Sequence, residues 1–150
     1  MPDSAPTDDS RNSIRGGGVR PHTIERIENG LIVVLAMSGT VVLAPTLWWF
    51  PLAAFLVFDL SQLGYLRSPA TGAAWYNAIH TYAWAAVLAV VALTLSTFSP
   101  TPSMWLALIA FAWAFHVGVD RAFGYGLKLP DAFTHTHMGW IGRDRHESRE

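Results

Sequence analysis

Long apolar runs alternate with short polar links along this chain of 150 residues. A helix needs about 20 residues to cross a bilayer, and fewer when residues at the interface anchor its ends. The apolar runs cover residues 30–44, 48–58, 83–98 and 104–115. Extended to the nearest polar residues, prolines and glycines, they predict an all-α, integral membrane four-helix bundle of two antiparallel hairpins, with helices over residues 24–44, 51–66, 73–98 and 104–123.

Polar segments flank this predicted membrane domain on both sides. Residues 1–23 are rich in Gly, Pro and Ser and mix acidic with basic side chains, which predicts a disordered N-terminal tail and not a signal peptide. The transmembrane domain then occupies residues 24–125. Residues 126–150 form a short, polar and basic tail that we expect in the cytoplasm.

Positive charge is confined to one side of this pattern. Of the ten Lys and Arg residues, nine lie in the two tails or at the helix ends beside them, and the tenth, Arg67, lies in the link between the second and third predicted helices. The links at residues 45–48 and 99–102 carry none. By the positive-inside rule, we expect a multi-pass protein of the inner (cytoplasmic) membrane with both termini in the cytoplasm. The net charge of −1 argues against nucleic acid as a partner, and the absence of cysteine excludes thiolate metal ligands.

Ionisable residues inside the apolar runs are the candidates for function, since a charge in hydrocarbon costs about 2.5–3.5 kcal/mol or more. At 1.5 Å per residue, each of them lies about 7–14 Å inward from the cytoplasmic end of its helix. His116 and Asp120 share a helix face because they are four residues apart, and Asn77 and His80 share one because they are three apart. We therefore expect one polar layer that contains Glu28, Asp59, Asn77, His80, His116, Asp120 and Arg121.

This set suits a divalent metal ion. Imidazole and carboxylate groups bind zinc, manganese and iron, and such a site activates water for hydrolysis. We expect Asp59, His80, His116 and Asp120 as metal ligands, with Glu28 or His137 as the catalytic base or acid. A site inside the membrane favours a lipid-like or membrane-bound ester or phosphoester substrate.

Two other interpretations fit the same residues. His80 and His116 would be axial ligands of a b-type haem in an accessory subunit of a larger complex. Alternatively, the polar layer only fixes helix packing in a scaffold subunit or a homo-oligomer. We also expect Arg121 to form an ion pair with Asp120 at the membrane interface, which is compatible with each of these interpretations.

Several multi-residue segments resemble a known family. FDLSQLGYL at 58–66, YNAIHTYA at 76–83, HVGVDRAFGYGLKLPDAF at 116–133, THMGWIG at 136–142 and IENG at 27–30 resemble the small bacterial membrane proteins catalogued as domain of unknown function 4260. The resemblance covers about residues 24–143 and implies supporting roles for Tyr65, Asn77, Arg121 and Tyr125. The family has no established activity. A shorter resemblance, at His80-Thr81 and at His116 and Asp120 followed by Gly-Tyr-Gly, is to inner-membrane metal-dependent hydrolases.

Overall fold

The computed structural model describes residues 21–142, which are all-α apart from one short pair of strands. The predicted all-α bundle is confirmed, whereas almost all of the predicted N-terminal tail and residues 143–150 lie outside the described residues. In chain order the elements are α2 (Pro21–Leu43), the 3-10 turn η1 (Pro45–Leu47), α3 (Phe50–Asp59), the 3-10 helix η2 (Leu60–Leu66), α4 (Pro69–Ile79), α5 (Tyr82–Leu95), α6 (Pro100–Phe123), β1 (His135–Thr136) and β2 (Gly139–Trp140).

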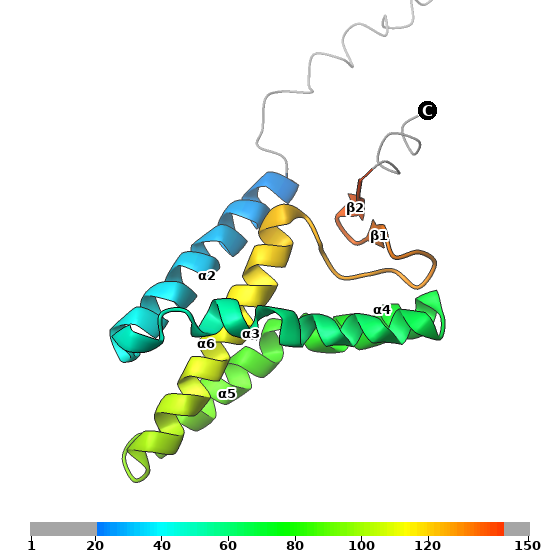
Figure 1. The fold of residues 1–150 in the computed structure, drawn as a ribbon. Coiled ribbons are helices and arrows are strands. Elements are labelled where there is room, and N and C mark those ends of the chain that lie inside the picture. Colours follow the sequence, from blue (N-terminus) through cyan, green and yellow to red (C-terminus); the bar gives the residue numbers. More distant parts are fainter. Residues whose placement is uncertain (1–20, 143–150) are drawn as a thin grey trace, which may run out of the picture.

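Helix α6 is the centre of the bundle, because α2, α3 and α5 all pack against it. Helices α2 and α5 run alongside α6, α3 lies across it, and α4 extends to one side of the bundle (Figure 1). Arg26, in the second turn of α2, donates from Nε to the carbonyl oxygen of Ala122 near the end of α6 at 2.7 Å. The beginning of α2 and the end of α6 therefore lie at the same end of the bundle.

The second predicted helix is not one continuous α-helix. α3 contains only 10 residues, and the chain then tightens into the 7-residue 3-10 helix η2. The Ser61 hydroxyl donates to the carbonyl oxygen of Phe58 at 2.9 Å, a local bond that competes with the α-helical ladder. Among the described residues, Pro21–Leu43, Pro69–Leu95 and Pro100–Phe123 are long and apolar enough to cross a membrane, and Phe50–Leu66 is a shorter apolar segment.

η2 and α4 pack together as a hairpin beside the bundle. Their backbones approach closely, because a Cβ on Gly64 would lie 3.1 Å from both the Cα of Gly72 and the carbonyl oxygen of Thr71. The Ser68 hydroxyl oxygen accepts the Thr71 N–H at 3.1 Å and so caps α4. The hairpin fixes the path of the chain between the end of α3 and the end of α4.

The third predicted helix is broken between α4 and α5, although no proline or glycine lies at the break. His80 leaves the helical conformation (φ −83°, ψ 43°) and Thr81 is extended. The Thr81 hydroxyl oxygen then accepts the Ala83 N–H at 3.3 Å and begins α5 as its N-cap. The chain changes direction here, so α4 extends to the side of the bundle while α5 runs along it (Figure 1).

A helix end leaves carbonyl oxygens without partners, which is unfavourable inside a membrane. Side chains from α5 and α6 satisfy the carbonyls at this break. The donors are Trp84 Nε1 to Ala78 O at 2.8 Å, Trp113 Nε1 to Ile79 O at 2.8 Å, and Arg121 Nη2 to His80 O at 3.3 Å. These hydrogen bonds stabilise the break between α4 and α5.

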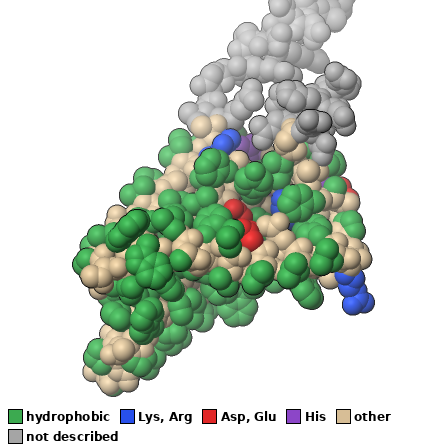
Figure 2. Space-filling view, viewed as in Figure 1, with side chains coloured by type: hydrophobic (Ala, Val, Ile, Leu, Met, Phe, Trp, Pro, Cys, Tyr) green, Lys and Arg blue, Asp and Glu red, His purple; other side chains and the backbone are tan. Residues whose placement is uncertain are grey.

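Apolar side chains cover most of the bundle surface seen in Figure 2. Large ones are exposed on every helix, among them Leu35, Val42, Leu56, Leu93 and Phe123. Three apolar helical segments of spanning length, with their apolar side chains outward, identify a membrane protein in contact with lipid.

The chain beyond α6 folds back over the bundle. Gly124 ends α6 in the left-handed conformation (φ 94°), which glycine adopts readily. β1 and β2 then pair antiparallel, with Thr136 opposite Gly139. The first part of the predicted cytoplasmic tail is thus an ordered segment that contacts α4 through Asn77.

Candidate metal centre

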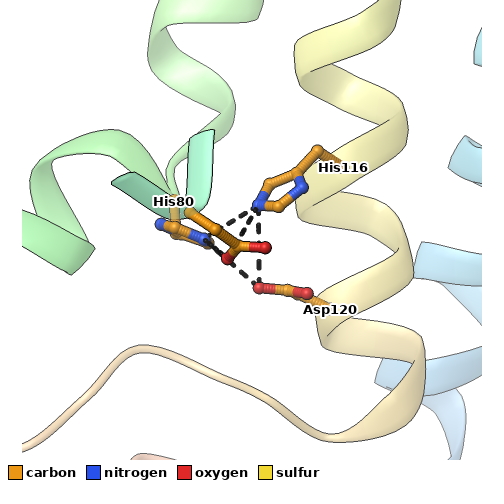
Figure 3. A group of neighbouring side chains, drawn as sticks. His80, His116 and Asp120 are labelled. Carbon is orange, nitrogen blue, oxygen red and sulfur yellow. Dashed lines mark hydrogen bonds and ion pairs between the residues drawn. The ribbon is translucent and has the colours of Figure 1, made fainter. Parts of the chain in front are cut away.

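The four predicted metal ligands meet at one point. One ligand atom from each of Asp59, His80, His116 and Asp120 lies within 4.8 Å of every other. The two imidazole Nε2 atoms are 2.9 Å apart. Figure 3 shows both rings and the Asp120 carboxylate turned toward one another.

Three different segments supply these side chains. Asp59 is the last residue of α3, His80 lies at the break between α4 and α5, and His116 and Asp120 lie one turn apart on α6. The break matters because it ends α4 beside α6 and leaves the His80 ring directed at the cluster. A helix that continued straight through residue 80 would carry α4 along the bundle axis instead.

The cluster is buried on the imidazole side and open on the carboxylate side. The side chains of His80 and His116 are 2% and 0% exposed, whereas those of Asp120 and Asp59 are 15% and 27% exposed. Acidic side chains are visible in the middle of the apolar face in Figure 2. A water molecule or substrate therefore has access from the side of Asp59.

Hydrogen bonds fix the His80 ring in the orientation that a metal ligand needs. Nδ1 lies 2.9 Å from the carbonyl oxygen of Tyr76. Because a carbonyl can only accept, Nδ1 carries the proton and the Nε2 lone pair faces the cluster. The Tyr76 ring stacks on the His80 ring with centroids 3.5 Å apart, and its hydroxyl donates to Asp120 Oδ2 at 2.7 Å.

Tyr76 is thus a functional candidate that the sequence interpretation missed. It is almost completely buried and contacts two of the four proposed ligands. Its spacing was a usable signal, since it lies four residues before His80 and so shares its helix face.

The other two proposed ligands are also held in place. Gln62 donates from Nε2 to Asp59 Oδ1 at 2.6 Å. Phe55 and Phe58 pack against the His116 ring, with centroids 4.3 and 5.2 Å away. His116 Nδ1 is buried and has no hydrogen-bond partner among residues 21–142. Contacts such as those of Gln62, Phe55 and Phe58 orient metal ligands in known sites. Within the described part of the chain, by contrast, His116 Nδ1 lacks the outer acceptor that a metal-bound histidine usually has.

The distances between imidazole nitrogens and carboxylate oxygens are close to those around a single small cation, whereas the two Nε2 atoms, 2.9 Å apart, would have to separate slightly to admit it. Metal–nitrogen and metal–oxygen bonds of about 2.0–2.1 Å in a tetrahedral site place the ligand atoms about 3.4 Å apart. His80 Nε2 is 3.3 Å from Asp120 Oδ2 and 3.8 Å from Asp59 Oδ1, and His116 Nε2 is 3.9 and 3.8 Å from the same two atoms. Two neutral imidazoles and two carboxylates would balance a divalent charge.

The predicted supporting residues surround the cluster without joining it. Asn77 makes two hydrogen bonds to the backbone of Lys128, and the Tyr125 carbonyl oxygen lies 3.3 Å from the Tyr76 hydroxyl. The Tyr65 hydroxyl is buried without a partner among the described residues. Arg121 bonds to the His80 carbonyl and lies over the Tyr82 ring at 4.9 Å, instead of forming the predicted ion pair with Asp120.

The two predicted acid–base residues lie apart from the cluster. Glu28 is exposed on α2, because its neighbour Asn29 faces inward and accepts a hydrogen bond from Tyr82. His137 is exposed and pairs through Nε2 with Glu25 at 3.1 Å, while its Nδ1 accepts the Leu127 N–H at 2.9 Å. Its side chain is thus turned toward α2 and away from the position we expected over the metal ligands.

Lys128 is a second residue that the sequence interpretation left out. It is only 3% exposed, and its Nζ has no hydrogen-bond partner among the described residues. The rings of Phe133, Tyr76 and Tyr125 surround the ammonium group at 4.2, 5.2 and 5.6 Å. Burial lowers the pKa of Lys128 to about 8, against the opposing effect of the Asp120 carboxylate. The side chain is therefore mostly charged at pH 7.

An apolar groove of about 500 Å³ lies elsewhere, between α5 and α6. Alanines line most of it, including Ala107. Since Ala107 and His116 are nine residues apart, or two and a half turns, they lie on opposite faces of α6. The groove is therefore separate from the His/Asp cluster.

The fold and the cluster together define an all-α membrane protein in which two histidines and two aspartates from three helical segments converge. The chain belongs to the family described as domain of unknown function (DUF4260), whose family model matches residues 22–141. No curated protein and no solved structure matches it. The similarity to membrane metal-dependent hydrolases thus gains no support from these comparisons.

Proposed function

We propose that this protein holds a divalent metal ion between Asp59, His80, His116 and Asp120, and that it hydrolyses a membrane-associated substrate. The observation that carries the proposal is the convergence of four ligand atoms within 4.8 Å, from residues far apart in the chain. Without a cation, two carboxylates held this close in a largely buried site would repel each other.

A divalent cation held by these residues would acidify a bound water molecule, which is the chemistry that hydrolysis requires. Asp59 is the more exposed carboxylate, so in the reaction it would act as the general base. His80, His116 and Asp120 would hold the ion and leave its fourth position to water. The water oxygen forms a bond to the ester carbon or phosphorus, and Asp59 accepts the proton. The bond to the leaving oxygen breaks, and that oxygen takes the proton back. Glu28 and His137 no longer have a part in this scheme.

The surroundings of the site favour a substrate that arrives from the membrane. Asp59 and Asp120 are partly exposed. Large apolar side chains next to Asp59 in the chain, Leu56, Leu60 and Leu63, are exposed as well. A water-soluble substrate would gain little from such a surface. A lipid-like ester or phosphoester would keep its apolar part in the bilayer while its polar group enters the cluster.

We also propose that the site faces the cytoplasm of a bacterial inner membrane. The start of α2 and the end of α6 lie at one end of the bundle, where Arg26, Arg121 and Lys128 are found. The positive-inside rule assigns that end to the cytoplasm, with both termini inside.

The geometry favours an ion over a haem. The two imidazole Nε2 atoms are 2.9 Å apart, and both carboxylates lie within 4 Å of them, which leaves no room for a porphyrin between the rings. Tyr76, Phe55 and Phe58 also pack directly against the two rings.

The test uses the full-length protein, purified in detergent, stripped with chelator and then titrated with Zn²⁺ or Mn²⁺. We expect one bound ion per chain by elemental analysis and calorimetry, with no Soret band. His116→Ala should abolish binding, whereas the matched control His135→Ala should not. Metal-loaded protein should release product from a phospholipid or ester substrate, and stripped protein should not.

Each alternative has its own result. A Soret band in the purified protein would establish the haem interpretation. If neither metal nor haem binds, and His80→Ala and Asp120→Ala only lower the melting temperature, the cluster is a structural polar network. Stoichiometric metal without hydrolysis of any substrate would restrict the proposal to metal binding.

A further inference from the structure

Lys128 is unusual because it is a buried cation with unused hydrogen-bond donors. Its ammonium group carries three N–H donors, and no acceptor among residues 21–142 bonds to them. Three aromatic rings surround it. Ring faces attract a cation but do not replace strong hydrogen-bond acceptors, so the charge is only partly compensated.

The fold holds this residue in place with several independent contacts. The Asn77 side chain donates from Nδ2 to the Lys128 carbonyl oxygen at 2.8 Å, and the Lys128 N–H donates to Asn77 Oδ1 at 2.7 Å. The backbone of Lys128 also forms a β-bridge with Thr136. A buried lysine whose N–H donors have no acceptors destabilises the folded protein. Its fixed position therefore indicates that a ligand supplies the acceptors.

A second unpaired polar atom lies beside it. The Tyr65 hydroxyl is buried without a partner among the described residues. Its ring packs against Phe133, with centroids 5.1 Å apart, and Phe133 is the ring nearest to the lysine ammonium. Tyr65 and Lys128 thus border the same small region, next to Tyr76 and the metal cluster.

We propose that Lys128 and Tyr65 form an anion subsite that binds a phosphate group of the substrate next to the metal ion. This inference rests on the proposed function and narrows its substrate class to phosphoesters. A divalent ion with two aspartates is neutral as a unit, and a phosphoester already carries negative charge when it binds, whereas a neutral ester develops charge only in the transition state. A fixed ammonium group beside the ion therefore favours binding of the phosphoester. An anionic phosphate would pair with the ammonium and accept its free N–H groups.

Phe133 controls access to this subsite. Its ring lies 4.2 Å from the Lys128 ammonium and is itself 44% exposed, so it separates the buried charge from the surroundings. It belongs to the segment after α6 and not to a helix. A phosphate group enters when this ring moves aside, and Phe133→Ala should speed its association.

The test is calorimetric titration of inorganic phosphate into the metal-loaded, full-length protein after removal of free metal. Charge-assisted hydrogen bonds contribute about 1.5–3 kcal/mol, so Lys128→Met should weaken phosphate binding about 10- to 100-fold. Tyr65→Phe should weaken it less. Arg67→Met removes an exposed positive charge at the tip of the hairpin and should change it less than about twofold.

A lipid headgroup and a free phosphomonoester present the same chemistry, and nanodiscs separate them. If the natural ligand is a headgroup, phosphatidic acid in the nanodisc should compete with free phosphate for the wild type but not for Lys128→Met. If it is a soluble phosphomonoester, only the soluble compound should compete. Either result supports the subsite.

Failure of this inference is distinguishable from failure of the proposed function. If metal binds and Lys128→Met binds phosphate as the wild type does, the subsite is excluded while the metal site stands. If no metal binds, the metal proposal falls, and the same phosphate titration of the metal-free protein decides the role of Lys128 alone. Circular dichroism spectra and melting temperatures verify that each variant is folded.

Discussion

Two pairs of histidines in this protein have carboxylate partners, and the pairs differ in almost every other respect. His80 and His116 are buried, lie 2.9 Å from each other and share two aspartates. His135 and His137 are more exposed, and each faces a single carboxylate, Asp131 at 2.6 Å or Glu25 at 3.1 Å.

The difference shows why proximity to a carboxylate is not enough to define a metal site. An exposed His–carboxylate pair satisfies itself and is screened by solvent, so it gains little from a cation. The buried pair leaves two imidazole nitrogens directed at each other beside two acids, an arrangement that a cation would stabilise. Burial and convergence, not residue type, separate the two.

The largest expected effect is on metal affinity. His80→Ala and His116→Ala should each lower the affinity for Zn²⁺ more than about 100-fold, because loss of even an outer partner of a ligand costs about 10- to 100-fold. His135→Ala and His137→Ala should stay within about twofold. Calorimetric titration of the four purified variants provides the measurement. An equal loss of Zn²⁺ affinity in all four would show that the buried and the exposed histidines do not differ as metal ligands.

Tyr76 sharpens the comparison, because it stacks on the His80 ring and also donates a hydrogen bond to Asp120, a carboxylate partner of that histidine. Tyr76→Phe keeps the ring on His80 but removes the hydrogen bond to Asp120. Metal affinity should fall about tenfold while the fold is retained. Tyr125→Phe is the matched control, since only the backbone carbonyl of Tyr125 contacts this network. An unchanged affinity in Tyr76→Phe would limit Tyr76 to packing.

The exposed pair at His137 should matter only for stability. Glu25→Gln removes its charge partner, and the free energy of unfolding should change by less than about 1 kcal/mol, as for other exposed ion pairs. Glu28→Gln, on the same exposed surface of α2, should leave both stability and hydrolysis unchanged. Thermal unfolding in detergent and a turnover assay check both. Loss of turnover in Glu28→Gln would restore the acid–base role that the sequence suggested.

The smallest effect concerns Asp131 and appears as a pH dependence. The hydrogen bond from His135 lowers the pKa of Asp131, which is exposed. A lowered pKa in the folded state adds stability above the ordinary carboxyl pKa, and this contribution disappears as the pH falls through the folded-state pKa. In His135→Ala the pKa of Asp131 should rise again, as followed by NMR of its carboxyl carbon. A pKa equal to that in the wild type would show that the pair does not form.

Much of the site followed from the sequence because it depends on helix periodicity alone. His116 and Asp120 are four residues apart on a helix that does continue from Pro100 to Phe123, so they share a face in the structure as expected. The matching depths of Asp59 and His80 were counted along continuous helices, whereas in the structure α3 ends at Asp59 and α4 ends just before His80. The structure nevertheless brings all four residues together.

Other parts of the site depend on contacts between distant segments. The sequence around Thr81 contains no proline or glycine to mark a helix break. The break is stabilised from a distance, since Trp113 and Arg121 of α6 donate to the carbonyl oxygens that it leaves free. Glu28 and Asn29 are adjacent polar residues, and only packing against Tyr82 determines which of them faces inward. In the sequence, Lys128 is indistinguishable from the other basic residues of the tail. Only the folding back of the chain after α6 buries it.

The sequence by itself determined the membrane class, the apolar helices and the set of titratable side chains placed within them, because hydrophobic length and period are properties of single segments. Only the tertiary structure decided which of those side chains meet, that α3 lies across α6 while α4 extends to its side, and that a lysine from beyond the last helix is buried beside the cluster. The physical reason is that burial and ligand geometry arise between segments, where side-chain packing and the pairing of freed carbonyls select one arrangement.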